Sequence, residues 1–360
     1  MERFHCGTRI VSGAGAVATL GELGAKRVLV VTDPFFRDNG TAERVAKATG
    51  APNWELFSQV APDPGLDLAA VGTAQVREFE PDLMVALGGG SAMDCAKAMK
   101  YFSGSSATFV ASPTTSGSGS EVTDFAILSH GGVKHPLVDE SLRPNVAILD
   151  SNLLEKLPAA LIADTGFDVL AHALEAWVAT GAGAISDALA RDAFCTAFAH
   201  LPASYAGDTG VRQSVHLAAT MAGMAFSQAG LGLCHAIAHS LGGAFHLPHG
   251  RLNAILLPAV MDHNSAAAGH KYAELARASG LGGSVDTIAI RNLKNALLRL
   301  RRTLALPENL AQAGVDPQAV RRKRDQLAAA VLEDPCCKTN PVKPTRAMVQ
   351  EILDRVTGHG

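Results

Sequence analysis

Short apolar runs alternate with amphipathic stretches through the first 150 residues. The runs are rich in β-branched residues and end in turn-forming or polar residues, which is typical of strands; they lie at 27–33, 82–90, 107–115 and 145–150. Helical spacing of apolar residues occurs between them, at 40–48, 66–79 and 92–102. Because the strands are apolar at nearly every position, the alternation predicts a parallel sheet with crossover helices on both faces.

From about residue 152 the pattern changes, and strand-like runs disappear. Ala- and Leu-rich stretches with a helical period follow at 158–180, 185–202, 210–229, 284–305 and 317–332. We therefore predict an α/β domain with a Rossmann-like parallel sheet over residues 1–151 and an all-helical domain over residues 152–360. A ligand is expected at the carboxyl ends of the strands, in the crevice that faces the second domain.

Composition narrows the function classes. The 360 residues are 48% hydrophobic and 18% charged with a net charge of −3, which indicates a folded chain. The basic run at 321–324 lies in a helical pattern and is interpreted as a solvated helix face, so no nucleic-acid partner is expected. No apolar run approaches the roughly 20 residues of a membrane span, and the N-terminal sequence lacks a signal-peptide pattern. Six cysteines without CxxC spacing favour a reduced, cytoplasmic enzyme.

Two glycine stretches compete for a phosphate group. The loop Gly88-Gly89-Gly90-Ser91 joins a predicted strand to a predicted helix, whose free N–H groups and positive dipole end suit a pyrophosphate. Its alternative is a glycine-rich turn without a ligand. The stretch Gly13-x-Gly15-x-x-Ala18 matches the dinucleotide fingerprint, but the strand before it is only Arg-Ile-Val. We therefore favour residues 88–91 for the phosphates.

Polar residues end two further predicted strands. Asp33 suits the hydroxyls of an adenosine ribose and would repel a 2′-phosphate, which favours NAD over NADP; alternatively it is a turn residue before Pro34. The segment PTTSGSGSE at 113–121 carries hydroxyls and glycines that can bind phosphate or a nicotinamide amide, or it is simply a polar loop. The loops at 88–91 and 113–121 follow neighbouring predicted strands. Together they favour a dinucleotide and make residues 1–151 the predicted dinucleotide-binding domain.

Four histidines fall within GLGLCHAIAHSLGGAFHLPHG, residues 230–250. A helix from about 232 to 241 places His235 and His239 on one face, and the Gly242-Gly243 pair is expected to end it. His246 and His249 then lie on a loop, from which His249 can fold back towards His235.

A second pair lies upstream. Asp168 and His172 are spaced i, i+4 on another predicted helix, so that one carboxylate and three imidazoles can converge on a divalent ion such as Fe²⁺ or Zn²⁺. Each member has an alternative: Asp168 could cap a helix through Thr165-x-x-Asp168, and His172 could be a core histidine with its hydrogen bonds satisfied. Burying several imidazoles together without a metal is costly, so the set as a whole favours a metal site.

These motifs together resemble the iron-containing (group III) alcohol dehydrogenases over nearly the whole chain. The resemblance is carried by GGGSAMDCAKA, PTTSGSGSEVT, DVLAH, MAFSQAGLGLCHAIAH and LPHG. Within the family it is closest to the branch from bacterial propanediol and ethanolamine utilisation, through HALEAWV and the whole of residues 223–250. The resemblance implies a dehydroquinate synthase-like architecture with an α/β and an all-helical domain.

The resemblance also implies roles for single residues. The metal ligands fall on Asp168, His172, His235 and His249, and His239 falls on a histidine that helps to move the alcohol proton. The cofactor contacts fall on Asp33, Gly89, Gly90, Ser91, Thr114, Thr115, Ser118 and Lys134. The implied cofactors are NAD(H) and one divalent metal, with Fe²⁺ favoured over Zn²⁺. Arg251 departs from the family, whose members carry a small or apolar residue there; it could touch substrate or cofactor, or point to solvent from a helix start.

The expected reaction is the reversible reduction of a small aldehyde, of the propanal or acetaldehyde type, to the primary alcohol with NADH. Residues 230–250 contain almost no Lys or Arg, which favours a small neutral substrate. The alternatives are a diol-, lactaldehyde- or glycerol-type dehydrogenase, a dehydroquinate synthase-like lyase, which would need more basic residues than Arg251 near the metal, and a non-catalytic shell-associated relative. A homodimer or larger assembly is expected, and association with a bacterial microcompartment is a further possibility that the resemblance raises.

Overall fold

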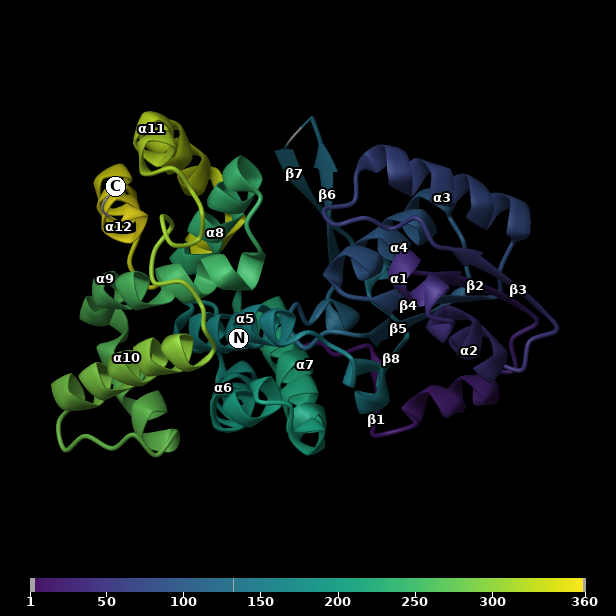
Figure 1. The fold of residues 1–360 in the computed structure, drawn as a ribbon, viewed down its shortest axis with the longest axis horizontal. Helices are drawn as coiled ribbons and strands as arrows, with labels where there is room; N and C mark the ends of the chain where they lie inside the picture. The colour runs from purple at the N-terminus through teal and green to yellow at the C-terminus, as the bar shows by residue number, and fades with distance from the viewer. Residues whose placement is uncertain (1–3, 132, 359–360) are drawn as a thin grey trace. The chain divides into compact units, whose positions relative to one another are not determined.

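The structure, a computed structural model, describes residues 4–131 and 133–358, with the backbone alone for residues 133 and 134. Contacts divide the described residues into two compact units, which comprise residues 5–157 and residues 158–358 (Figure 1). The sequence predicts the boundary at residue 151. The first unit extends past that point because the 3-10 helix η4 (Ser151–Leu154) places Leu153 against the core of the sheet.

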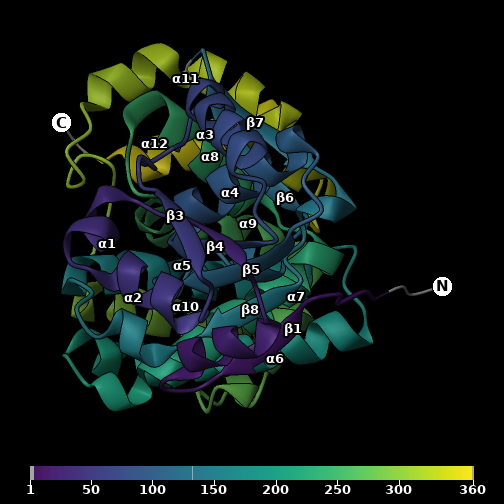
Figure 2. The same cartoon turned by 90° about the vertical axis from the view of Figure 1, so that its right-hand side faces the viewer.

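A six-stranded sheet organises the first unit, and every strand pair in it is parallel. The strand order is β1-β8-β5-β4-β2-β3, and the labels of β1, β8, β5, β4 and β3 follow this order in Figure 2. The strands are β1 (Arg9–Ser12), β2 (Arg27–Val31), β3 (Asn53–Phe57), β4 (Leu83–Gly88), β5 (Thr108–Pro113) and β8 (Val146–Leu149). The central strand β4 is buried at every residue, which is why its sequence is a continuous apolar run. The predicted parallel sheet is confirmed.

Helices cover both faces of this sheet and make two separate apolar layers. Helices α3 (Leu66–Phe79) and α4 (Gly90–Ser103) pack on one face, and η1 (Ala16–Leu23) and α2 (Thr41–Ala48) pack on the other. Alternate residues of each strand point to opposite faces, so Met84 joins the first layer and Val85 the second. The short helix α1 (Pro34–Asp38) follows β2 directly.

A two-stranded antiparallel hairpin, which the sequence pattern does not reveal, follows the β5 loop. It consists of β6 (Phe125–His130) and β7 (Val133–Val138). Lys97 of α4 ties it to the loop, because its fully buried ammonium donates hydrogen bonds of 2.8–3.0 Å to Ser120 Oγ, to Thr123 and to the carbonyl of Phe125. Burial lowers the pKa of Lys97 to about 8. The 3-10 helices η2 (Ser120–Val122) and η3 (Glu140–Leu142) complete this region.

The second unit is helical throughout its described residues (Figure 1). Its helices are α5 (Ala159–Val178), α6 (Ala184–Tyr205), α7 (Arg212–Ala229), α8 (Leu233–Phe245), α9 (His249–Ala278), α10 (Asp286–Thr303), α11 (Pro317–Glu333) and α12 (Arg346–Thr357), with η5 (Thr209–Val211) and η6 (Pro335–Thr339). Helix α5 is buried along nearly its whole length and contacts α6, α7 and α9. Polar residues on such a helix need partners inside the protein, and α5 carries Asp164, Asp168, His172 and Glu175.

Among the described residues, no single helix has both the length and the apolar character to cross a membrane. One pair of helices passes that test only when joined, Thr209–Ala229 with Leu233–Phe245, and the two are bent by 104° at the break.

Candidate metal centre and cofactor loops

Helix α5 brings Asp168 and His172 to one face, one turn apart, as predicted. The alternative that Asp168 caps a helix does not hold, because Asp168 lies in the interior of α5 and the Thr165 hydroxyl donates to the carbonyl of Leu161. The start of α9 lies directly against α5 at Gly250. A Cβ built on Gly250 would lie 1.8 Å from the carbonyl oxygen of Asp164, so only glycine permits this approach.

Helix α8 carries His235 and His239, but it does not end at Gly242-Gly243 as predicted. It continues to Phe245 and ends at His246, whose backbone is left-handed with φ 55°. A helical glycine costs only about 1 kcal/mol relative to alanine, and burial of the surrounding apolar face outweighs that cost. His249 therefore lies not on a loop but on the first turn of α9, after Pro248.

The four predicted ligands meet in the helical unit. One donor atom from each of Asp168, His172, His235 and His249 lies within 4.8 Å of all the others. Asp168 Oδ1 is 3.9 Å from His235 Nε2 and 3.6 Å from His249 Nε2, and Asp168 Oδ2 is 3.9 Å from His172 Nδ1. Asp168, His172 and His235 are buried, whereas a third of the His249 side chain is exposed. The His172 ring stacks between those of Phe226 and His235, which fixes its orientation.

The protonation states suit metal binding. Desolvation favours a protonated Asp168, but the neighbouring histidines and a hydrogen bond from Asn253 outweigh it and lower the pKa of that carboxyl. Burial lowers the pKa of His235 and that of His249 well below the ordinary histidine value. A carboxylate and neutral imidazoles are the forms in which these groups bind a metal, and the lowered pKa values of Asp168, His235 and His249 favour these forms.

The polar atoms of this cluster fit a cation. His172 Nδ1 is buried and has no hydrogen-bond partner among the described residues. The amide nitrogen of Asn253 lies 2.7 Å from Asp168 Oδ1, 3.2 Å from His235 Nε2 and 3.3 Å from His249 Nε2, so acceptor atoms from three residues face the same small space. Mixed carboxylate and imidazole donors are typical of Fe²⁺ and Zn²⁺ sites, and the residues present fit such an ion.

Glu175 holds one of these histidines in place and was missed by sequence reasoning. Its carboxylate lies 2.7 Å from His235 Nδ1 and accepts hydrogen bonds from the backbone N–H groups of Gly232 and Cys234 at the start of α8. Asn340 Oδ1 accepts the N–H of Leu233, so side chains from outside satisfy this helix terminus. Its spacing on α5, three residues after His172, places Glu175 on the same face as His172, but does not indicate His235 as its partner.

We expect Glu175→Gln to weaken metal binding about 10- to 100-fold. The glutamine oxygen can still accept an α8 N–H, but its amide nitrogen next to His235 Nδ1 would donate, which would move the ring proton to Nε2 and block that donor atom. Competition with a chelator of known affinity measures the dissociation constant. Glu274→Gln, on an exposed position of α9, is the control; equal metal affinity of both variants would contradict the role given to Glu175.

His239 lies beside the four donors but is not one of them. Its ring stacks on that of His249 with centroids 5.2 Å apart, and a third of its side chain is exposed. Its Nδ1 is 2.8 Å from Asp334 Oδ2. His246, at the exposed end of α8, belongs neither to the four donors nor to the His239–Asp334 pair.

The first unit brings most of the predicted cofactor residues together at the carboxyl ends of β2, β4 and β5. A Cβ built on Gly88 would lie 3.8 Å from Asp33 Oδ2, and Cβ atoms on Gly89 and Gly90 would lie 3.3 Å from Thr115 Oγ1 and 3.4 Å from Ser118 Oγ. Gly88 has φ +153°, so a residue with a side chain would be strained at position 88. Asp33 also caps α1, accepting from the N–H of Phe36, so it does act in the turn at Pro34, and its role towards a ribose stays a prediction.

The remaining cofactor predictions are placed as follows. Thr114 is buried and its N–H donates to the carbonyl of Gly88, and Ser91 lies on the first turn of α4. The prediction for Lys134, on β7, concerns a side chain outside the described residues. The competing fingerprint at residues 13–18 is used within the protein, because Asp150 accepts the N–H groups of Gly15 and Val17 at 2.9 and 3.0 Å.

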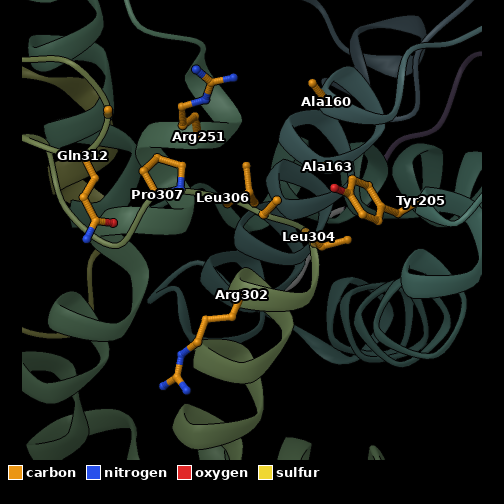
Figure 3. A pocket seen from close by; sticks show the side chains of 11 residues that line it. Ala160, Ala163, Tyr205, Arg251, Arg302, Leu304, Leu306, Pro307 and Gln312 are labelled. Carbon is orange, nitrogen blue, oxygen red and sulfur yellow. The ribbon is translucent and has the colours of Figure 1, made fainter.

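Arg251 is paired inside the helical unit. Its guanidinium binds Asp164 through two hydrogen bonds, of 3.1 Å from Nε and 2.9 Å from Nη2. It lines a cavity of about 560 Å³, in which Figure 3 shows Arg251 and Arg302 pointing away from each other and Tyr205 beside Ala163. Among the described residues that line this cavity, none belongs to the four-donor cluster.

Comparison with known proteins identifies the family. The profile described as "Iron-containing alcohol dehydrogenase" matches residues 7–151, and "Fe-containing alcohol dehydrogenase family, C-terminal" matches residues 162–357. The chain belongs to the iron-containing alcohol dehydrogenase family. Its resemblance to this family is thereby confirmed, and it is an oxidoreductase of the alcohol dehydrogenase type.

Several relatives within the family span the whole chain. The 1-propanol dehydrogenase PduQ of Citrobacter freundii is 40% identical over 99% of this chain and 100% of its own length. The NADPH-dependent butanol dehydrogenase of Clostridium saccharobutylicum is 35% identical over 99% of this chain and 98% of its own.

Solved structures of the family have the same fold. The iron-containing alcohol dehydrogenase of Thermococcus thioreducens gives a TM-score of 0.90 with 34% identity, covering 98% of this chain and 99% of its own. The sulfoacetaldehyde reductase of Bifidobacterium kashiwanohense, solved in complex with NAD+, gives 0.90 with 25% identity over the full length of both chains, 100% of each. The dehydroquinate synthase-like fold is confirmed.

Proposed function

We propose that this protein is a metal-dependent alcohol dehydrogenase that reversibly reduces a small aldehyde, of the propanal or acetaldehyde type, to the primary alcohol with NADH. The observation that carries the proposal is the convergence of Asp168, His172, His235 and His249 within 4.8 Å. The family and the full-length similarity to a 1-propanol dehydrogenase support the substrate class.

The four donors would hold one divalent ion, with Fe²⁺ favoured and Zn²⁺ as the alternative. When bound, such an ion supplies Lewis-acid polarisation of a carbonyl or alkoxide oxygen. His239 carries the proton between the hydroxyl group and solvent, since it is a third exposed and stacks on His249. The Phe226 ring covers one face of His172, which excludes water from that side of the donors.

NADH is proposed as the hydride source, bound by the loops that end β2, β4 and β5. The loop at residues 88–91 presents the N-terminus of α4 to a pyrophosphate, and Thr115 and Ser118 offer hydroxyls beside it. The Asp33 carboxylate near Gly88 would accept ribose hydroxyls and repel a 2′-phosphate. One solved relative binds NAD+, whereas another relative is named NADPH-dependent. The proposed preference for NADH over NADPH therefore rests on Asp33.

The test is metal analysis of protein purified without oxygen, combined with initial rates for propanal, acetaldehyde, lactaldehyde and glycerol. We expect one equivalent of iron per chain, highest kcat/KM for propanal or acetaldehyde, and a preference for NADH over NADPH. Highest kcat/KM for glycerol or lactaldehyde would overturn the substrate class. A strong preference for NADPH would overturn the role of Asp33, and full activity in metal-free protein would overturn the metal mechanism.

A further inference from the structure

His239 is hydrogen-bonded to a carboxylate, and the sequence does not predict this pairing. Asp334 lies 95 residues further along the chain, at the junction of α11 and η6, and its Oδ2 is 2.8 Å from His239 Nδ1. Its other oxygen, Oδ1, accepts the N–H of Cys336 at 2.8 Å and so caps η6. The Asp334 side chain is only 15% exposed, and these two bonds fix both of its oxygens.

Asp334 is a carboxylate at neutral pH. Desolvation alone would favour its protonated form, but the His239 ring and the Cys336 N–H outweigh that effect and lower the pKa of Asp334 to about 2. An ionised carboxylate can only accept hydrogen bonds, so the proton in the bond must belong to His239 Nδ1. In a neutral imidazole, Nε2 then carries the lone pair and is the nitrogen that can take up a proton.

We propose that Asp334 is a positioning residue, which keeps the ring proton of His239 on Nδ1 and leaves Nε2 as the proton acceptor in alcohol oxidation. The inference rests on the proposed function of His239. In oxidation, the nicotinamide cofactor would supply the hydride acceptor for the alcohol carbon, and His239 Nε2 would accept the hydroxyl proton. The imidazolium that results is stabilised by the Asp334 carboxylate and then releases the Nε2 proton to solvent. Reduction of the aldehyde runs through the same atoms in reverse.

The variant Asp334→Asn distinguishes the effect of Asp334 on the His239 ring proton from its role as the N-cap of η6. The asparagine oxygen can still accept the Cys336 N–H, whereas its amide nitrogen would donate to His239 Nδ1 and move the ring proton to Nε2. We expect kcat for alcohol oxidation to fall roughly 10²-fold, the lower end of general acid–base effects, with KM and metal content unchanged. Asp316→Asn is the matched control, because Asp316 also caps a helix by accepting a backbone N–H, that of Gln318, but its other oxygen pairs with Arg322 instead of a histidine.

A double-mutant cycle and a spectrum complete the test. In a His239→Ala background, Asp334→Asn should not lower kcat further; a drop of the same factor there would mean that Asp334 acts only through the fold, and would overturn the inference. ¹⁵N NMR of the histidine side chains in metal-free protein should show His239 protonated at Nδ1, and at Nε2 in Asp334→Asn. An unchanged tautomer would also overturn it. Lack of alcohol turnover by the wild type would instead contradict the proposed function, while the spectrum would still decide the Asp334–His239 pairing.

Discussion

Replacing His235 by alanine is expected to remove the bound metal and almost all alcohol dehydrogenase activity. His235 is 1% exposed, and its Nε2 faces Asp168 and Asn253, so the variant loses one donor and leaves a space that no other described side chain fills with a ligand. Loss of Lewis-acid stabilisation worth about 4 kcal/mol corresponds to roughly 10³-fold in rate. Metal content by elemental analysis and initial rates with propanal measure the two effects.

His246→Asn is the control for His235→Ala. His246 lies in the same histidine-rich stretch and is exposed, and asparagine tolerates its left-handed backbone better than alanine does. We expect wild-type metal content and kcat for this variant. A His235→Ala protein that kept its metal and its rate would show that the donor set is wrongly assigned.

Replacing Gly250 by alanine is expected to destabilise the helical unit by about 3 kcal/mol, at the upper end of overpacking effects. The added Cβ would lie 1.8 Å from the carbonyl oxygen of Asp164 and 3.1 Å from Asp168 Cβ. A backbone atom cannot rotate away, so α5 and α9 must separate, and the distance between Asp168 and His249 must grow with them. Urea unfolding measures the loss of stability, and metal affinity should fall in parallel.

Gly243→Ala is the control, because we expect it to raise the stability of the protein, whereas Gly250→Ala lowers it. Gly243 is in the interior of α8, and a Cβ there would have no atom within 4 Å. Alanine restricts the unfolded chain, so this variant should gain up to about 1 kcal/mol. If Gly250→Ala were as stable as Gly243→Ala, the close approach of α5 and α9 would be refuted.

Local patterns in the sequence predict much of the fold and the donor set. The buried strand β4 reads as an apolar run because both of its faces are covered, and Asp168 and His172 can be placed on one helix face by their spacing. The course of α8 was predicted wrongly, because glycine propensity is a weak signal that tertiary packing overrides. Whether His249 lies on a loop or on a helix depends on the same contacts.

Partners far apart in the sequence could not be predicted. Glu175 is 60 residues from His235 and Asp334 is 95 residues from His239, so no local periodicity connects them. The use of the Gly15 and Val17 N–H groups by Asp150 depends on the pairing of β1 with β8, which only the folded sheet defines. Asn253, one turn after His249 on α9, becomes predictable only once the start of that helix is known.

The start of α8 has a consequence for the order in which this protein matures. Its N–H groups are held by Glu175 and Asn340, across sequence separations of 57 and 107 residues. Contacts of such separation form late in folding, because long loops must close first. A nascent chain that lacks the segment around Asn340 still has Glu175, but it lacks the acceptor of the Leu233 N–H at the start of the helix that carries His235. In the proposed enzyme, α8 would therefore be fully anchored for metal binding only after the segment around Asn340 has been made.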